Sequence, residues 1–448
     1  MSAASRFDTP RVQAPAPLRL PAIERSTLAN GLRVWTLPHN SLPVVALSVL
    51  IDVGTADDPA TLPGLTALTI DMLDEGADGL DAIQFAERLG DLGATCDLGA
   101  SPDASSALLW TLATQLEPAL RLVASALMRP RLADADLARV RDLRLSRLQQ
   151  ARRSGAAMAD RALTSAIYGA HGYGHGGLGT TAALTRATID DVRAQYQRYV
   201  GSNRTTIVAA GAVPHDALVR VVEQCFGAWA PIPAVARAFA APPAPAPRVL
   251  FVEREDAPQS EIRVGHLAPA RATPDYHALL LLNAGLGGSF SGRLNQRLRQ
   301  QLGYTYGARS AFDFDRDAGM FLCDSSVQAD KTADSVREIH ALLAAVRGTA
   351  PLDGDELELA RGSLTLGYAR GFETPRQLAA GLAQLVAYGL PDDVFDRFVP
   401  TITALTAADV ARAAEIHVQP SQLTTVVVGD ARWRDALGDG VETVQPEF

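Results

Sequence analysis

The sequence predicts an α+β protein built from two homologous halves, each an antiparallel-rich β-sheet covered by helices. Three observations predict this fold. Strand-like and helix-like segments alternate in clusters rather than as regular strand–helix units. A Pro/Ala-rich stretch at 231–247 divides the 448 residues into parts of similar length. A helix followed by an apolar strand occurs near the end of both parts. The expected domains are therefore residues 1–230 and 248–448, joined by a linker at 231–247.

The first half contains the patterns of several helices and strands. Proline-rich residues 11–22 predict an extended arm, and Asn30-Gly31 predicts a turn. The apolar runs 32–37 and 44–53 are expected to form a strand pair. Apolar residues at helical spacing predict helices over 62–73, 81–93, 114–128 and 134–153, with strands between 93 and 114.

The second half repeats the end of the first without gaps. Residues 184–192 align with 402–410 at an offset of 218, and the register continues through Val200 with Val418 and Gly211 with Gly429. Two copies of one domain explain this agreement most simply, while chance similarity of two helix–strand units is the alternative.

Composition excludes several classes of protein. The chain has 41 Lys and Arg against 50 Asp and Glu, a formal charge of −9, which argues against a nucleic-acid or anionic-membrane surface. No uncharged apolar run approaches the ~20 residues that span a bilayer. The three cysteines stand far apart in the sequence and in no metal-binding or redox spacing. We therefore expect reduced thiols and no disulfide scaffold. The polar first residues show no secretory signal, although a trimmed signal would leave the same sequence, and we expect a cytoplasmic protein.

The stretch 287–310 contains the most chemical information. Leu294, Leu298 and Leu302 recur every fourth residue and predict a short helix that ends near Gly303. A strand is expected to follow, with Tyr304, Tyr306 and Ala308 on one face and Thr305, Gly307 and Arg309 on the other. Arg299 lies off the leucine stripe and is expected to reach the strand that carries Tyr306. Both side chains donate hydrogen bonds to oxygen-rich ligands. The alternative is a structural Arg at a helix end and tyrosines packed on a sheet.

Several of these features together resemble one peptidase family. They are the two halves of roughly 220 residues, the segments LANGLRV at 28–34 and GLTAL at 64–68, and the 287–310 stretch. The chain resembles the pitrilysin/insulinase zinc metallopeptidases over nearly its whole length, and most closely their bacterial branch related to mitochondrial processing peptidase. The most specific element is Arg299 to Tyr306. The resemblance implies two processing-peptidase-like domains that face each other across a chamber.

The zinc motif of that family is degenerate in this chain. Active members carry His-x-x-Glu-His on a helix of the first half, with both imidazoles on one face and the Glu beside the metal-bound water. The matching positions hold Ala67, Leu68, Thr69, Ile70 and Asp71. A third ligand, a Glu, is expected near the end of 134–153, but no acidic residue lies between Leu143 and Ser154. The resemblance therefore implies that this chain holds no metal.

One pair of histidines has metal-like spacing. His171 and His175 are four residues apart, but their surroundings are glycine-rich and no Glu separates them. Such a loop does not preset the geometry that a helix gives to this spacing. A loop with two hydrogen-bonded or exposed histidines is the favoured interpretation, and an independent enzyme that uses them is a third hypothesis.

The resemblance implies a non-catalytic, zinc-free subunit of a heterodimeric zinc metallopeptidase. Arg299 and Tyr306 would then act in trans on a peptide substrate, with Zn in a homologous partner whose motif is intact. The substrate loop would comprise Gly287, Gly288, Ser289, Phe290 and Ser291. Arg297 and Tyr304 have the same seven-residue separation and are the alternative pair. A structural assembly subunit with no peptidase role is the alternative function.

Overall fold

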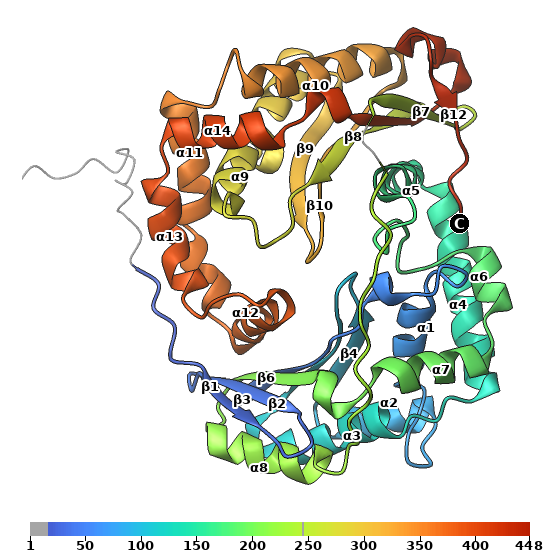
Figure 1. The fold of residues 1–448 in the computed structure, drawn as a ribbon, viewed down its shortest axis with the longest axis vertical. Helices are drawn as coiled ribbons and strands as arrows, with labels where there is room; N and C mark the ends of the chain where they lie inside the picture. Colours follow the sequence, from blue (N-terminus) through green and yellow to red (C-terminus); the bar gives the residue numbers. More distant parts are fainter. Residues whose placement is uncertain (1–16, 244–245) are drawn as a thin grey trace, which may run out of the picture.

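The computed structural model describes residues 17–243 and 246–448 and contains two six-stranded sheets that face each other (Figure 1). Residues 11–16 of the predicted arm and 244–245 of the linker lie outside the described residues. Each sheet is packed with helices, and strands of both directions occur in each. The α+β fold with two sheet-containing halves is therefore confirmed.

Both sheets have the same strand order. The first is ordered β1-β2-β6-β3-β5-β4, and in the second β7, β11, β8, β10 and β9 take the places of β2, β6, β3, β5 and β4. Only β2 and β6 run parallel in the first sheet. The strands are β1 (Glu24–Thr27), β2 (Arg33–Pro38), β3 (Val44–Ile51), β4 (Thr95–Ala100), β5 (Ser105–Leu112), β6 (Thr205–Gly211), β7 (Arg248–Glu253), β8 (Gln259–Ala268), β9 (Thr305–Phe314), β10 (Gly319–Gln328), β11 (Thr424–Gly429) and β12 (Glu442–Thr443).

One predicted pairing is wrong. The sequence predicts that the strands at 32–37 and 44–53 pair, but β6 lies between β2 and β3. The turn at Asn30-Gly31 instead joins β2 to β1, and Gly31 has φ +86°. Every residue of β6 is buried, so this strand is stable only in the middle of the sheet with both faces covered. The long chain separation between β2 and β6 hides this pairing from local patterns.

The helices also follow a common order. Five α-helices come between β5 and β6 in the first half, and five come between β10 and β11 in the second. The helices of the first half are α1 (Leu65–Asp71), α2 (Ala82–Asp91), α3 (Leu116–Met128), α4 (Asp134–Arg153), α5 (Gly155–Tyr168), α6 (Thr181–Arg186), α7 (Ile189–Tyr199) and α8 (His215–Phe226). Those of the second half are α9 (Tyr276–Asn283), α10 (Thr332–Arg347), α11 (Gly354–Thr365), α12 (Pro375–Tyr388), α13 (Val394–Ala404) and α14 (Ala407–His417), with π-helices η4 (Ala284–Gly288) and η5 (Asn295–Gln301).

The repeat extends to the caps of α7 and α14. Thr188 caps α7 and Thr406 caps α14, each by accepting a hydrogen bond from the backbone N–H of the residue three positions later. Those residues, Asp191 and Asp409, return a carboxylate to the N-cap N–H, which completes a capping box at both sites. The same N-terminal capping signal therefore begins the equivalent helix in both halves.

The two halves exchange equivalent helices. Helix α12 lies on the inner face of the first sheet, where Leu382 and Leu385 pack against residues such as Val208 (Figure 1). Helix α5 lies on the inner face of the second sheet, where Leu163 packs against residues such as Val426 (Figure 1). The outer face of each sheet is covered by helices of its own half. Each sheet therefore has one apolar face that only the other half covers.

The described part of the linker is attached to the first half. Residues 231–243 form no helix or strand. Arg237 donates two hydrogen bonds to the Asp57 carboxylate, at 3.0 and 2.7 Å, and the Phe239 ring lies 5.1 Å from that of His171. This segment is held along the surface by specific contacts.

The hairpin between β9 and β10 reaches the first half. Arg316 donates from its backbone N–H to the Asp103 carboxylate at 2.8 Å and from its guanidinium to Asp52 at 2.9 Å. Tyr173 donates its hydroxyl proton to the other Asp103 oxygen at 2.6 Å. Burial, together with the charges of Asp103 and Asp313, raises the pKa of Asp315 to about 7. The halves thus meet through a polar cluster as well as through exchanged helices.

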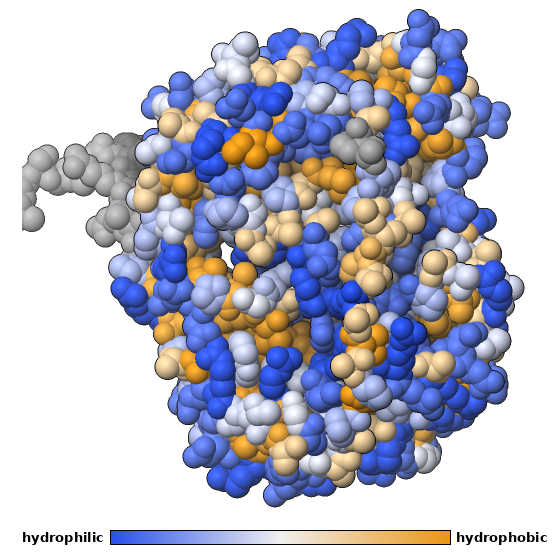
Figure 2. Space-filling view, in the orientation of Figure 1, coloured by the Kyte–Doolittle hydropathy of each residue, from blue (hydrophilic) through white to orange (hydrophobic). Residues whose placement is uncertain are grey.

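Across the described ranges, no helix has both the length and the apolar character needed to cross a bilayer. The visible surface is largely hydrophilic, and apolar residues gather around the opening between the upper and lower halves (Figure 2).

Leu382→Ala is expected to destabilise both halves together. Leu382 is 2% exposed, so its truncation should lower the free energy of unfolding by about 2–5 kcal/mol. Urea denaturation followed by circular dichroism measures this change. The control is Leu366→Ala, since Leu366 is 51% exposed in the same half. Equal effects of the two substitutions would refute the structural role assigned to α12.

Asp315→Asn is expected to stabilise the protein more at pH 8 than at pH 5. An acid whose folded pKa is raised favours the folded state fully below its unfolded pKa, and this contribution is lost as the pH rises through about 7. The Asn variant should gain about 2–3 kcal/mol over the wild type between these pH values, at about 1.4 kcal/mol for each of the two pH units from 5 to 7. Urea titrations at both pH values test this, with the exposed Asp439→Asn as control. A gain that does not change with pH would contradict the assignment.

Candidate functional site

The predicted helix before Gly303 is present, but it is a π-helix. Residues 295–301 form η5, and the Leu302 N–H donates to the Arg297 carbonyl oxygen at 3.1 Å. Leu294 and Leu298 are fully buried in the second core, as the leucine stripe predicts. Gly303 has φ +68°, the left-handed conformation expected at the helix end. Single-turn π-helices occur frequently at functional sites.

The strand after Gly303 contains a β-bulge at Tyr306 and Gly307. The pairing with β10 shifts between Ser325 and Val327, so these two residues oppose a single residue of β10. The Gly307 N–H donates to the Thr305 hydroxyl at 3.0 Å, which fixes the bulge. Tyr306 is 89% exposed, whereas Ala308 is buried. The prediction that Tyr306 and Ala308 share a face is therefore wrong, because a bulge reverses the alternation.

Arg299 lies over the exposed ring of Phe290. Its guanidinium carbon is 4.4 Å from the ring centroid, a cation–π contact. Within the described parts of the chain, Arg299 makes no ion pair or hydrogen bond, and neither does the Tyr306 side chain. Helix η5 packs against β9, so the two side chains project from adjacent elements. Their donors remain available to a ligand.

The alternative pair is engaged in the fold. Arg297 donates two hydrogen bonds to Glu338, at 2.8 and 2.9 Å, and this contact lowers the pKa of the Glu338 carboxyl. Tyr304 is partly buried against the second core. Geometry therefore favours Arg299 and Tyr306 over Arg297 and Tyr304 as ligand donors.

The glycine-rich loop has structural reasons for its glycines. A Cβ at Gly287 would lie 2.6 Å from the Ser310 backbone nitrogen, and one at Gly288 would lie 2.5 Å from the Asn283 amide nitrogen. Ser289 donates to the Ala284 carbonyl oxygen at 2.8 Å. Phe290, at 66% exposed, is the large side chain that the loop presents to a ligand.

The degenerate zinc positions lie on α1 and are filled by packing. Ala67, Leu68, Thr69 and Ile70 are all buried. Asp71 accepts a hydrogen bond from Arg144 at 2.6 Å, and Arg144 is 3% exposed and also donates to the Gly177 carbonyl oxygen. A buried guanidinium beside Asp71 opposes the binding of a second cation. The residues at these positions do not fit zinc.

Helix α4, near whose end the resemblance places a third zinc ligand, contributes arginines that pair with acidic residues of α1 and of the segment after it. Arg144 pairs with Asp71, and Arg139 pairs with Glu75 just after α1. Burial raises the pKa of the nearby Asp74 to about 6. Among the residues that the structure describes, no group of three or more His, Cys, Asp or Glu side chains could hold a metal. Ion pairs link α1 to α4 in this chain.

His171 and His175 face different surroundings. His171 is buried, and its ring lies within 6 Å of the Tyr168, Tyr173 and Phe239 rings. His175 lies 3.8 Å from the buried Asp58 carboxylate. Burial lowers the pKa of His171, so it is neutral at pH 7. These different surroundings favour the interpretation of a loop with two separately engaged histidines over a metal pair.

Each sheet has an edge strand next to these elements. Strand β4 ends the first sheet and packs against α1, and strand β9 ends the second sheet and carries Tyr306. Leu108 of β5, which pairs with Asp97 of β4, is 48% exposed, and Leu112 at the end of β5 is 47% exposed. Sequence patterns did not indicate these leucines, since their alternation is that of any half-buried strand.

Asp71→Asn is expected to lower the free energy of unfolding by about 1–3 kcal/mol, because it removes the charge that compensates the buried Arg144. Thermal and urea denaturation measure the loss. The control is Asp190→Asn, which removes the partner of Arg193 at a site where the carboxylate side chain is 87% exposed. Equal stability of Asp71→Asn and the wild type would show that the pair does not hold α1 to α4.

Several known proteins are similar to this chain. A family described as Peptidase M16 inactive domain matches residues 186–364. The chain is 27% identical over 354 residues to an uncharacterized zinc protease of Mycobacterium leprae, covering 78% of this chain and 79% of the relative. It is 22% identical to the probable mitochondrial-processing peptidase subunit beta of Arabidopsis thaliana over 425 residues, covering 92% of this chain and 79% of the relative.

Solved structures share the fold. One from Pseudomonas fluorescens, described as a peptidase M16 inactive domain, has a TM-score of 0.86 at 24% identity and covers 91% of this chain and 98% of its own. A protease from Helicobacter pylori has a TM-score of 0.82 at 19% identity, covering 91% and 100%. The match to the M16 inactive-domain model over residues 186–364 and the relatives named zinc proteases agree with the peptidase-family resemblance of the sequence, and the solved structures share its fold.

Proposed function

We propose that this chain is a non-catalytic subunit that supplies Arg299 and Tyr306 to a zinc-bearing homologous partner during peptide hydrolysis. The observation that carries the proposal is a contrast between neighbouring side chains. Arg297 is engaged by Glu338, while Arg299 and Tyr306 keep their donors free within the described residues. On α1, Asp71 is neutralised by Arg144 in place of a metal.

The chemistry of these two side chains suits a peptide carbonyl. A guanidinium and a phenol donate hydrogen bonds and so stabilise negative charge that develops on the carbonyl oxygen. Zinc in the partner would polarise the carbonyl and supply the attacking water. Phe290 holds the Arg299 guanidinium by its ring face, which limits the rotamers of a long side chain without using any N–H donor.

A peptide would bind as an added strand. Edge strands β4 and β9 expose backbone donors and acceptors, which bind an extended peptide independently of its sequence. Tyr306 projects from the bulge of β9, where the ladder to β10 is already interrupted. The exposed Leu108 and Leu112 of β5 offer apolar contacts to peptide side chains.

The test is peptide cleavage by this chain combined with a homologous chain that has an intact His-x-x-Glu-His motif. Arg299→Gln and Tyr306→Phe should each lower kcat by about 10²–10³-fold, the usual effect of losing one oxyanion donor. Neither variant should change the melting temperature substantially, because neither side chain makes a hydrogen bond or ion pair with a described residue and Arg299 loses only its cation–π contact with the exposed Phe290. Quenched fluorescent peptides give the rates.

Arg297→Gln is the matched control. It makes the same change two residues away and should lower stability by losing the Glu338 contact, with kcat unchanged within a few-fold. A loss of rate in Arg297→Gln but not in Arg299→Gln would assign the role to the alternative pair. If the partner alone were fully active, the structural assembly role would be the remaining interpretation of this chain. Stoichiometric zinc and hydrolysis in this chain alone would overturn the proposal.

A further inference from the structure

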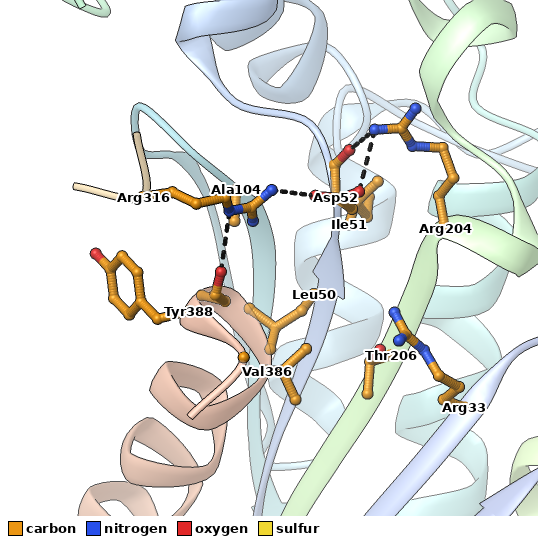
Figure 3. Close-up of a pocket in the computed structure, with 12 residues that line it drawn as sticks. Arg33, Leu50, Ile51, Asp52, Ala104, Arg204, Thr206, Arg316, Val386 and Tyr388 are labelled. Atoms are coloured by element: carbon orange, nitrogen blue, oxygen red, sulfur yellow. Dashed lines mark hydrogen bonds and ion pairs between the residues drawn. The ribbon is translucent and has the colours of Figure 1, made fainter. Parts of the chain in front are cut away.

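A pocket lies between the two halves, away from the candidate site on η5 and β9. Its volume is about 340 Å³, and its walls come from both halves. The first half contributes the start of β2, the end of β3 and the start of β6, and the second half contributes Arg316 and the C-terminal end of α12 (Figure 3). The volume suits a single amino-acid residue or a similar small group.

Three arginines and one carboxylate line the pocket. Arg204 and Arg316 approach the Asp52 carboxylate from opposite sides, at 3.2 and 2.9 Å (Figure 3). Burial disfavours the charge of Asp52, but the hydrogen bond from Arg316 and the charges of the neighbouring arginines hold its pKa below the usual value. Asp52 is therefore ionised, and its charge is shared by Arg204, Arg316 and the Arg237 guanidinium, which lies 3.7 Å away. The third arginine of the pocket lining, Arg33, is exposed at the start of β2, and its side chain has no ion pair or hydrogen bond with a described residue.

Arg33 has an unpartnered hydroxyl as its neighbour. Arg33 and Thr206 are register partners on β2 and β6, and Figure 3 shows their side chains on the same side of the sheet. Thr206 is 1% exposed, and its hydroxyl oxygen has no hydrogen-bond partner among the described residues. A buried hydroxyl without a partner is costly, so it indicates that a further polar group completes this site.

The remaining walls are apolar. Leu50 lies beside Thr206 across the β3–β6 pairing, and Val386 approaches from α12. An anion that enters this pocket would therefore meet guanidinium at one side and aliphatic carbon at the other.

The pocket suits a monoanion better than a dianion. The Asp52 carboxylate and the carbonyl oxygens at the end of α12 also face it, and Ala387 already accepts from Arg316 at 3.1 Å. These acceptors repel concentrated negative charge. A planar carboxylate can accept two parallel hydrogen bonds from one free guanidinium.

We infer that this pocket binds a carboxylate carried on an apolar group, such as the C-terminal residue of a peptide, with the carboxylate on Arg33 and the apolar part on Leu50 and Val386. The site goes beyond the proposed function, because binding there requires neither a partner subunit nor Arg299 and Tyr306. Since both halves form the pocket, its ligand also stabilises their contact.

The first test compares N-acetyl-L-leucine with N-acetyl-L-leucinamide by isothermal titration calorimetry on the full chain. The acid should bind and the amide should bind at least about tenfold more weakly, because a charge-assisted hydrogen bond is lost. N-acetyl-L-glutamic acid α-amide, which has only a side-chain carboxylate, separates acidic side chains from peptide C-termini as the source. Inorganic phosphate should bind more weakly than the acid. Equal binding of acid and amide would overturn the inference, as would tighter binding of phosphate.

The second test uses Arg33→Gln, with the exposed Arg220→Gln of α8 as a control that makes the same change in net charge. Arg33→Gln should lose at least about tenfold in affinity for N-acetyl-L-leucine, and Arg220→Gln should match the wild type. The acid should raise the melting temperature of the wild type and the control only. Unchanged affinity in Arg33→Gln would refute the site. Because peptide cleavage is not measured, failure of the partner proposal does not affect these outcomes.

Discussion

The exchange of α5 and α12 is the constraint on which the rest of this structure depends. Strands β6 and β11 are buried on both faces, and each has one face that only a helix of the other half covers. Neither sheet is complete without the other half, so the boundary at 231–247 does not separate two independent cores. The same exchange brings the end of α12 to the inner face of the first sheet and so forms one wall of the Arg33 pocket.

Polar contacts then fix how the halves meet. Asp103 accepts from Tyr173 of the first half and from Arg316 of the second, and Asp52 accepts from Arg204 and Arg316. Such contacts are directional, whereas the apolar packing of the exchanged helices is not. The ion pairs therefore specify the relative position of the halves, and helix packing supplies most of the stabilisation.

Two regions differ in how their polar groups are engaged. In the first half, α1 is an apolar helix, Arg144 of α4 pairs with Asp71, and Arg139 of α4 pairs with Glu75 just after α1. In the second half, a π-helix and a bulge present Arg299 and Tyr306 without using their donors. The charged groups around α1 are paired within the fold. The donors of Arg299 and Tyr306 are not, and a ligand would satisfy them. This asymmetry is what the proposed role in a heterodimer would explain.

The sequence by itself determined the elements whose signals are local. Leucine spacing and Gly303 predicted the helix end, and the repeated register predicted two equivalent halves. The missing histidines at 67 and 71 are likewise visible in the chain. The tertiary structure decided what depends on distant residues: the insertion of β6 between β2 and β3, the bulge that turns Tyr306 outward, the pairing of Arg144 with Asp71, and the Arg33 pocket. Each joins segments far apart in the chain, and hydrophobic periodicity contains no information about which distant surfaces will meet.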